Sequence, residues 1–306
     1  MTPRHITLAK AEPHLDWLAL TDALERGHTL PKAQMQDVVF RRGPDTMLSR
    51  HAWIDGLGLI VKTATVFPGN ARHNLPNING LTTLYSDQTG AVEATLDFAL
   101  VTKWKTAADS LLAARHLARP DSQNILIIGA GSVAASMIQA YSALFPTARF
   151  QIWNRTTDKA HLIAAACPGH AITAATDLAD AVGQADIIAC CTMANQPVLQ
   201  GKWLRPGQHV DLIGAYLPSM READDTALKR ARVFVDCHET TIDHIGELID
   251  PIANGTIKRS DILGDFYDIK GGDFIRRSDA EITLHKNGGG AHLDLMTCCY
   301  ILKALT

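Results

Sequence analysis

The middle of the chain alternates short apolar runs with longer stretches of helical pattern. Residues 125–128 form an apolar run that ends at a glycine turn, a helical pattern follows to about Leu144, and a second apolar run covers 149–153. Later apolar runs of strand length occupy 185–190, 209–214 and 232–236. Strands that alternate with helices predict an α/β fold with a Rossmann-type, doubly wound parallel sheet of about six strands.

The first third of the chain follows another pattern. Residues 57–66 form a strand-like run, and a further pair of strand-like runs brackets the turn at 87–90. Residues 94–118 contain neither glycine nor proline and predict one long helix, which ends before Pro120. These residues therefore predict an α+β domain whose last helix leads into the parallel sheet.

The C-terminal tail departs from the strand–helix alternation. A glycine triplet at 288–290 precedes an apolar helical pattern at about 292–305, and we expect this tail to rejoin the first domain. The chain is 306 residues long, which is enough for two domains with cores of their own. We predict a substrate-binding and dimerisation domain from 1–118 with 279–306, and a dinucleotide-binding domain from 119–278.

Charge and cysteine usage exclude several functions. The net charge is −3 and the basic residues are scattered, so neither a nucleic acid nor an acidic membrane surface is an expected partner. No apolar run approaches the roughly 18 residues that cross a bilayer, and the start lacks a signal-peptide core, so a cytoplasmic location is expected. The six cysteines show no metal-ligand spacing, and no metal is expected.

The glycine turn after the first central strand has the pattern of a dinucleotide site. It comprises Gly129, Ala130, Gly131, Ser132 and Val133, followed by Ala134. The first glycine permits the tight turn, the second lets backbone N–H groups approach a pyrophosphate, and the small alanine lets the helix pack close to the strand. A tight turn in an ordinary α/β sheet is the alternative.

The end of the second central strand indicates which dinucleotide is bound. An acid that binds the ribose of NAD is usual here, but this chain has Asn154, Arg155 and Thr156. A guanidinium pairs well with a 2′-phosphate, so NADP(H) is the preferred cofactor, with NAD(H) as the alternative. Arg155 is otherwise a solvated loop residue.

Several motifs together resemble the ornithine cyclodeaminase/μ-crystallin family over nearly the whole chain. They are Lys62 with Phe67-Pro68-Gly69-Asn70, the helix segment 100–108, the glycine turn, Cys191-Thr192, 203–207, 214–218, 246–248 and 289–294. The resemblance implies a homodimer that acts on a small amino or imino acid between its two domains. We also expect a cofactor site that includes Cys191, Thr192, Met193, Gly214 and Asp294.

Two departures from the family pattern narrow the activity. Cyclodeaminases and alanine dehydrogenases of the family have a catalytic aspartate where this chain has Tyr216, and an arginine for the substrate carboxylate where it has Lys105. Lysine can pair with a carboxylate, but only as a point charge. The stretch 214–222 and the tail at 290–294 are more similar to the ketimine-reductase branch.

The candidate catalytic residues are Lys62 and Lys105, which we also expect to bind the substrate. Lys62 alternates with apolar residues along a strand, and Lys105 shares a helical stripe with small residues. The alternatives are an edge-strand lysine that prevents strand pairing, and an ion pair between Lys105 and Asp109 on the helix surface.

Three further residues complete the expected substrate site, each less tightly placed by the sequence. Arg50 precedes the Lys62 strand, Thr83 or its neighbour Thr82 offers a hydroxyl, and His292 follows the glycine triplet. For His292 and Asp294, a capped helix start is the alternative. The expected reaction is NADPH-dependent reduction of a cyclic imino acid, 1-pyrroline-2-carboxylate or its six-membered homologue. The alternatives are an oxidoreductase of an acyclic imino or amino acid, and a non-enzymatic NADPH-dependent binding protein.

Overall fold

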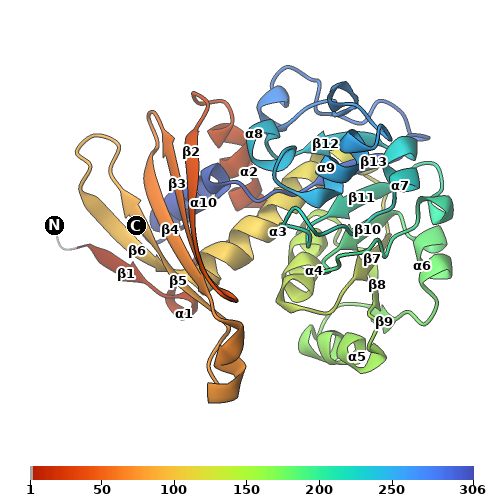
Figure 1. Ribbon diagram of the computed structural model, residues 1–306, viewed down its shortest axis with the longest axis horizontal. Helices are drawn as coiled ribbons and strands as arrows, with labels where there is room; N and C mark the ends of the chain where they lie inside the picture. Colours follow the sequence, from red (N-terminus) through yellow and green to blue (C-terminus); the bar gives the residue numbers. More distant parts are fainter. Residues whose placement is uncertain (1–2) are drawn as a thin grey trace. The chain divides into compact units, whose positions relative to one another are not determined.

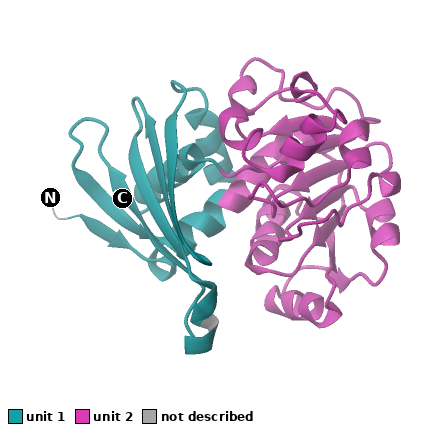
Figure 2. Cartoon of the chain, in the orientation of Figure 1, with its two compact units in different colours: residues 1–105, 290–306 teal, residues 106–289 magenta. Residues whose placement is uncertain are grey.

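The chain forms two compact units in the computed structural model, which describes residues 3–306 (Figure 2). Unit 1 combines the residues up to Lys105 with Gly290–Thr306, and unit 2 comprises Thr106–Gly289. Each unit has its own sheet (Figure 1). The units share one helix, α3 (Phe98–Leu117), whose first turns belong to unit 1 and whose remainder belongs to unit 2.

Unit 1 is built on a six-stranded sheet with the order β1-β6-β5-β4-β3-β2. Its strands pair antiparallel except β1 with β6. The strands are β1 (Arg4–Ile6), β2 (Gln34–Arg42), β3 (Asp45–Ile54), β4 (Gly58–Val66), β5 (Ile78–Tyr85) and β6 (Val92–Asp97).

One face of this sheet is covered by a helix that packs in turn against a second helix. The C-terminal helix α10 (Ala291–Ala304) contacts β3, β4 and the helix α2 (Trp17–Gly27). A side chain at Gly27 would collide with Met296, so the glycine allows α2 and α10 to pack closely. The C-terminal helix thus lies in the same unit as the N-terminal residues.

Unit 2 contains a seven-stranded parallel sheet with the order β12-β13-β11-β10-β7-β8-β9. The strands are β7 (Asn124–Ile128), β8 (Arg149–Trp153), β9 (Ile172–Ala174), β10 (Ile187–Cys190), β11 (His209–Leu212), β12 (Arg232–Val235) and β13 (Thr283–Lys286). The chain starts at β7, adds β8 and β9 on one side and then β10 and β11 on the other. This is the doubly wound topology expected from the sequence.

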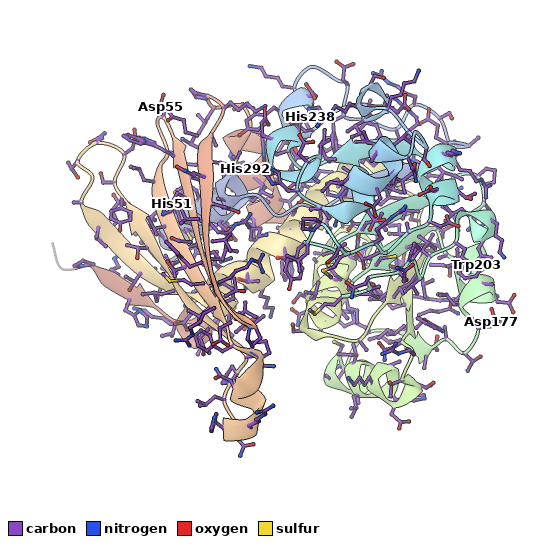
Figure 3. All side chains as sticks on the ribbon, in the orientation of Figure 1. His51, Asp55, Asp177, Trp203, His238 and His292 are labelled. Carbon is purple, nitrogen blue, oxygen red and sulfur yellow. The ribbon has the colours of Figure 1, made fainter. Side chains whose placement is uncertain are left out.

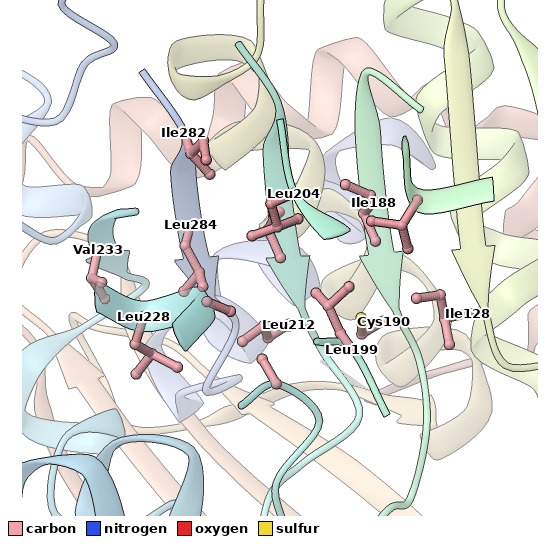
Figure 4. Close-up of a cluster of buried hydrophobic side chains, with 14 of the residues drawn as sticks. Ile128, Ile188, Cys190, Leu199, Leu204, Leu212, Leu228, Val233, Ile282 and Leu284 are labelled. Carbon is pink, nitrogen blue, oxygen red and sulfur yellow. The ribbon is translucent and has the colours of Figure 1, made fainter. Parts of the chain in front are cut away.

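The strand β13 corrects the expected boundary between the domains. Residues from 279 onward were expected to leave the Rossmann domain, but β13 pairs with β11 and β12 inside its sheet. The strand Thr283–Lys286 is short and ends close to the glycine triplet, so its sequence resembles a linker. The apolar core of unit 2 nevertheless includes Ile282 and Leu284 from this segment (Figure 4).

The remaining helices are short and mostly belong to unit 2. The α-helices are α1 (Leu8–Ala11), α4 (Ser132–Leu144), α5 (Thr157–Ala166), α6 (Leu178–Gln184), α7 (Asp225–Arg230), α8 (His238–Thr241) and α9 (Gly246–Ala253). The 3₁₀ helices are η1 (Glu12–His14), η2 (Pro68–His73), η3 (Gly201–Trp203), η4 (Arg259–Asp261) and η5 (Phe266–Asp268). Among residues 3–306, no helix combines the length and the apolar character that a membrane span requires.

Candidate active site

Lys62 lies on β4 in unit 1, with a side chain that is only 4 % exposed. Its neighbours on the same strand face, Ile60 and Ala64, are also buried, as the alternating pattern predicted. The Lys62 ammonium donates a hydrogen bond of 2.8 Å to Oδ1 of Asp294 on α10 and lies 4.8 Å from the ring centre of Phe98. An edge-strand lysine that points to solvent is therefore the wrong interpretation of Lys62.

The charged groups that act on Lys62 and its partner Asp294 are mostly positive. Burial lowers the pKa of Lys62, Asp294 opposes this effect, and the positive charges of Lys105 and Arg50 lower the pKa further. Burial alone would raise the pKa of Asp294, but Lys62, Lys105 and Arg50 together hold it below its usual value. Three cations therefore act on one buried carboxylate. Such a cluster attracts a second anion, and a carboxylate on a ligand would supply it.

The other cations are held by different elements of unit 1. Lys105 is 6 % exposed, so it lies inside the protein and not on a helix surface. Arg50 on β3 makes an ion pair of 3.0 Å with the more exposed Asp37 on β2. In the sheet register Arg50 lies directly opposite Lys62, which explains why its charge acts on the lysine.

The register also corrects the expected threonine. Thr82 on β5 lies directly opposite Lys62, whereas Thr83 lies opposite Val61 and so faces the other side of the sheet. Thr82 is fully buried, and within residues 3–306 its hydroxyl has no hydrogen-bond partner. Thr82 therefore replaces Thr83 as the hydroxyl on the face of Lys62.

The two tail residues have different surroundings. The His292 ring is fully buried on α10 (Figure 3) and packs edge-to-face against His28, with 5.1 Å between ring centres. Asp294 is fully buried in unit 1 and bound to Lys62. Substrate binding by His292 stays a prediction, and the contacts of Asp294 favour a role beside Lys62 over the expected cofactor contact.

In unit 2, the glycine turn joins β7 to α4 as the sequence predicted. Gly129 has a φ of +112°, and a Cβ there would lie 2.7 Å from the Cys191 carbonyl oxygen. Gly131 is the N-cap residue of α4, so the turn residues Ala130, Ser132 and Val133 surround a helix N-terminus. Backbone N–H groups at such a terminus attract a phosphate.

The turns after β7, β10 and β11 lie at the same edge of the parallel sheet. Cys191 and Thr192 follow β10, and Gly214 comes two residues after β11. A Cβ at Gly214 would overlap the backbone of Thr192, so these two turns are in direct contact. β7 and β10 are also the neighbours at which the strand order reverses, the usual dinucleotide position in this fold. Met193, beside them, is 73 % exposed.

Sequence reasoning missed the side chain that joins these turns. Glu222 is fully buried, and its carboxylate accepts hydrogen bonds from Thr192, Gly214 and Ala215. Burial, opposed by the Lys286 charge, raises the pKa of Glu222 to about 7. The stretch around Glu222 has no periodicity, so only its partners in the fold reveal the role.

The expected phosphate-binding segment forms the loop after β8. Arg155 and Thr156 are exposed, and the Asn154 amide donates a hydrogen bond of 2.9 Å to the Thr156 carbonyl. This bond shapes the loop and leaves the guanidinium of Arg155 in solvent. Tyr216, in the loop after β11, is 53 % exposed. Its phenol occupies the position at which cyclodeaminases of the family have a catalytic aspartate.

One group of side chains has the composition of a metal site. Ligand atoms of Cys237, Glu239 and Asp265 lie within 4.8 Å of one another. The Nδ1 atom of His238, a residue labelled in Figure 3, lies 3.6 Å from the Asp265 carboxylate. Burial raises the pKa of the Cys237 thiol, which donates a hydrogen bond of 3.1 Å to Glu239. These side chains form a hydrogen-bonded cluster at the start of α8, where the His238 N–H also donates to the Asp265 carboxylate.

Comparisons with known proteins agree with this architecture. The chain is 49 % identical over 307 residues to the Delta(1)-pyrroline-2-carboxylate reductase of Paracoccus denitrificans, covering 99 % of this chain and 97 % of that protein. An archaeal alanine dehydrogenase dimer with bound NAD has a TM-score of 0.91 at 26 % identity, with 99 % and 96 % of the two chains covered.

Another similar structure is that of Thermococcus litoralis Delta(1)-pyrroline-2-carboxylate reductase in complex with NADH and L-proline. It has a TM-score of 0.91 at 24 % identity, with 98 % and 97 % of the two chains covered, and supports the fold. The model of the ornithine cyclodeaminase/mu-crystallin family matches residues 46–305. This chain therefore belongs to the ornithine cyclodeaminase/mu-crystallin family.

Proposed function

We propose that this protein is a reductase of a cyclic imino acid, with 1-pyrroline-2-carboxylate as the substrate and L-proline as the product. The observation that carries the proposal is the cluster of Lys62, Lys105 and Arg50 around the buried Asp294, which provides for an anionic ligand. The 49 % identity to the Paracoccus reductase supports the same reaction. A substrate with a carboxylate next to its C=N bond satisfies both observations.

The side chains of unit 1 divide the work on the substrate. Lys105 and Arg50 bind the carboxylate by charge, and the Thr82 hydroxyl offers a further hydrogen bond. Lys62 keeps the ring nitrogen of the substrate protonated. Desolvation lowers the pKa of Lys62, and the lysine therefore exchanges a proton more easily near neutral pH. Asp294 holds the Lys62 ammonium in place at 2.8 Å. A protonated C=N bond is already electrophilic, so unit 1 needs only to bind the carboxylate and to keep the ring nitrogen protonated.

The turns of unit 2 are proposed to hold the dinucleotide. The N–H groups at the start of α4 bind the pyrophosphate, and the backbone around Thr192 and Gly214 forms the wall for the nicotinamide. When bound, the reduced nicotinamide supplies the hydride. Transfer requires the reacting carbons to approach within about 3–3.5 Å.

NADPH is proposed as the preferred form of the cofactor. Arg155 is exposed in the loop after β8, and Asn154 occupies the position where an acid would repel a 2′-phosphate. A planar guanidinium can pair with that phosphate through two hydrogen bonds.

A dimer is also proposed, formed through the sheet face that α10 leaves uncovered. Strands β2, β3 and β5 expose large apolar side chains on this face: Phe40, Met47, Trp53 and Leu81. Large apolar side chains exposed on one face of a sheet favour an interface there. The archaeal alanine dehydrogenase, with its TM-score of 0.91, is described as a dimer and supports a second copy as the partner.

A pair of incubations tests the reaction. We expect 1-pyrroline-2-carboxylate with NADPH to yield proline, and L-ornithine with NAD to release no ammonia. Cyclodeamination must move protons during attack and expulsion of ammonia, and the phenol of Tyr216 is a poor substitute for a carboxylate in that role. Ammonia release at a comparable rate would contradict this argument, and inactivity in both incubations would favour a binding protein.

A further inference from the structure

The Glu222 carboxylate accepts four hydrogen bonds, three of them from backbone N–H groups. One carboxylate oxygen, Oε1, accepts from the Thr192 N–H at 2.7 Å and from the Thr192 hydroxyl at 2.9 Å. The other, Oε2, accepts from the N–H groups of Gly214 at 2.6 Å and Ala215 at 3.1 Å. Four donors from two turns therefore converge on one side chain that is fully buried.

The two turns depend on this carboxylate for their backbone pairing. They follow β10 and β11, where the ladder between the strands has ended. The Gly214 N–H is shared with the Cys190 carbonyl at 3.2 Å, and Glu222 provides its shorter bond. A buried N–H group without an acceptor is costly, so without the carboxylate the turns would rearrange or admit water.

Glu222 is itself held by a second buried carboxylate. Glu247 on α9 accepts hydrogen bonds from the N–H groups of Glu222 at 2.7 Å and Ala223 at 3.0 Å. The buried Lys286, bound to the Leu212 carbonyl at 2.8 Å, supplies the positive charge that favours the ionised form of both acids. The hydrogen bonds between Glu247 and the backbone at Glu222 and Ala223 therefore fix the position from which the Glu222 side chain extends.

We propose that Glu222 is a positioning residue that fixes the nicotinamide-binding turns at Thr192 and at Gly214–Ala215. Because both oxygens are occupied by protein donors, the residue acts through the backbone and does not touch the cofactor. This inference rests on the proposed use of a nicotinamide dinucleotide, and it adds the side chain that shapes its site.

The test compares Glu222→Gln with Asp186→Asn. The glutamine keeps the size of Glu222 but turns an NH₂ group toward two of the four donors. Asp186 is a matched control because its carboxylate also accepts backbone N–H bonds, from Gln123 and Asn124, at the amino end of β7. Loss of this acid should lower stability without changing the turns after β10 and β11.

Hydrogen exchange and dinucleotide binding are the measurements. In Glu222→Gln without dinucleotide, we expect amide exchange at Thr192, Gly214 and Ala215 to accelerate about 10-fold, with NADPH bound about 10-fold more weakly by fluorescence titration. At saturating NADPH, the KM for the imino acid should stay within twofold of wild type. Asp186→Asn should show neither local change.

The outcomes separate this inference from the proposed function. Normal exchange and normal NADPH affinity in a folded Glu222→Gln protein would overturn it, even if the wild type reduces the imine. If the wild type neither binds NADPH nor reduces the imine, the proposed function fails, while the exchange result still decides whether Glu222 fixes the turns. If Glu222→Gln does not fold, Thr192→Val, which removes only the hydroxyl bond, should show a smaller change of the same kind. An unchanged Thr192→Val protein would then overturn the inference.

Discussion

The candidate sites of the two units are built in opposite ways. In unit 1, charged side chains themselves make the site, with Lys62 and Asp294 buried in contact at 2.8 Å. In unit 2, the expected ligand contacts are backbone groups at the ends of parallel strands, and the charged side chain, Glu222, is hidden behind them. In unit 1 the sheet therefore positions the charged side chains of the site, whereas in unit 2 a buried charged side chain positions the backbone of the site.

This difference decides how each site responds to substitution. Removing one of these side chains from unit 1 removes a group that is proposed to contact the substrate, so binding or chemistry should change directly. Removing a side chain from unit 2 acts through the backbone, unless the side chain reaches solvent as Arg155 does. The following predictions test the comparison in order of expected effect.

The largest effect is expected for Lys62→Met. The thioether fills the same space but can neither carry nor exchange a proton, so kcat should fall by about 10²–10³-fold, within the range that positioned acids and bases contribute. Steady-state kinetics with 1-pyrroline-2-carboxylate measures this loss, and NADPH affinity serves as the internal control. An unchanged kcat would show that solvent alone supplies the proton.

The next effect is expected for Arg155→Ala. Loss of a charge-assisted pair with the 2′-phosphate should lower kcat/KM for NADPH by about 10- to 100-fold and leave NADH almost unaffected. Arg149→Ala is the matched control, because Arg149 is an exposed arginine at the other end of β8. If the unaltered protein uses both cofactors equally well, the proposed preference is wrong.

A smaller effect is expected for Lys105→Ala. The KM for the imino acid should rise about 10-fold, since one charge-assisted contact to the carboxylate is lost while Arg50 remains. Lys103→Ala is the control on the same helix, because Lys103 pairs with Glu12 and is partly exposed. A stability loss with unaltered kinetics would instead favour a structural role for Lys105.

The sequence predicted those features that depend on local patterns. Apolar runs and a glycine turn follow from neighbouring residues, and they located the parallel sheet and the helix α4. The alternation along β4 likewise placed Lys62 on a covered face. Such patterns repeat over a few residues, so one chain is enough to read them.

Features that depend on distant partners could not be predicted in the same way. The choice between Thr82 and Thr83 is a shift of one residue, which only the pairing of β4 with β5 decides. Asp294 lies 232 residues after Lys62, and Glu222 meets turns that follow two other strands. β13 is too short to be recognised before its neighbours in the sheet are known.

The smallest kinetic effect, a shift in pH dependence, is expected for Asp294→Asn. The negative charge of Asp294 raises the pKa of Lys62 against the opposing effects of burial, Lys105 and Arg50. Without that charge, the pKa of Lys62 falls further, and the lysine loses its proton at a lower pH. If the protonated ammonium is the working form, the alkaline limb of the kcat/KM profile should move to lower pH, with activity best preserved in acid. Asp37→Asn is the control, because Asp37 is more exposed and pairs with Arg50 instead. A profile that moves equally in both variants would mean that the overall charge of the cluster, and not the contact with Asp294, sets the behaviour of Lys62.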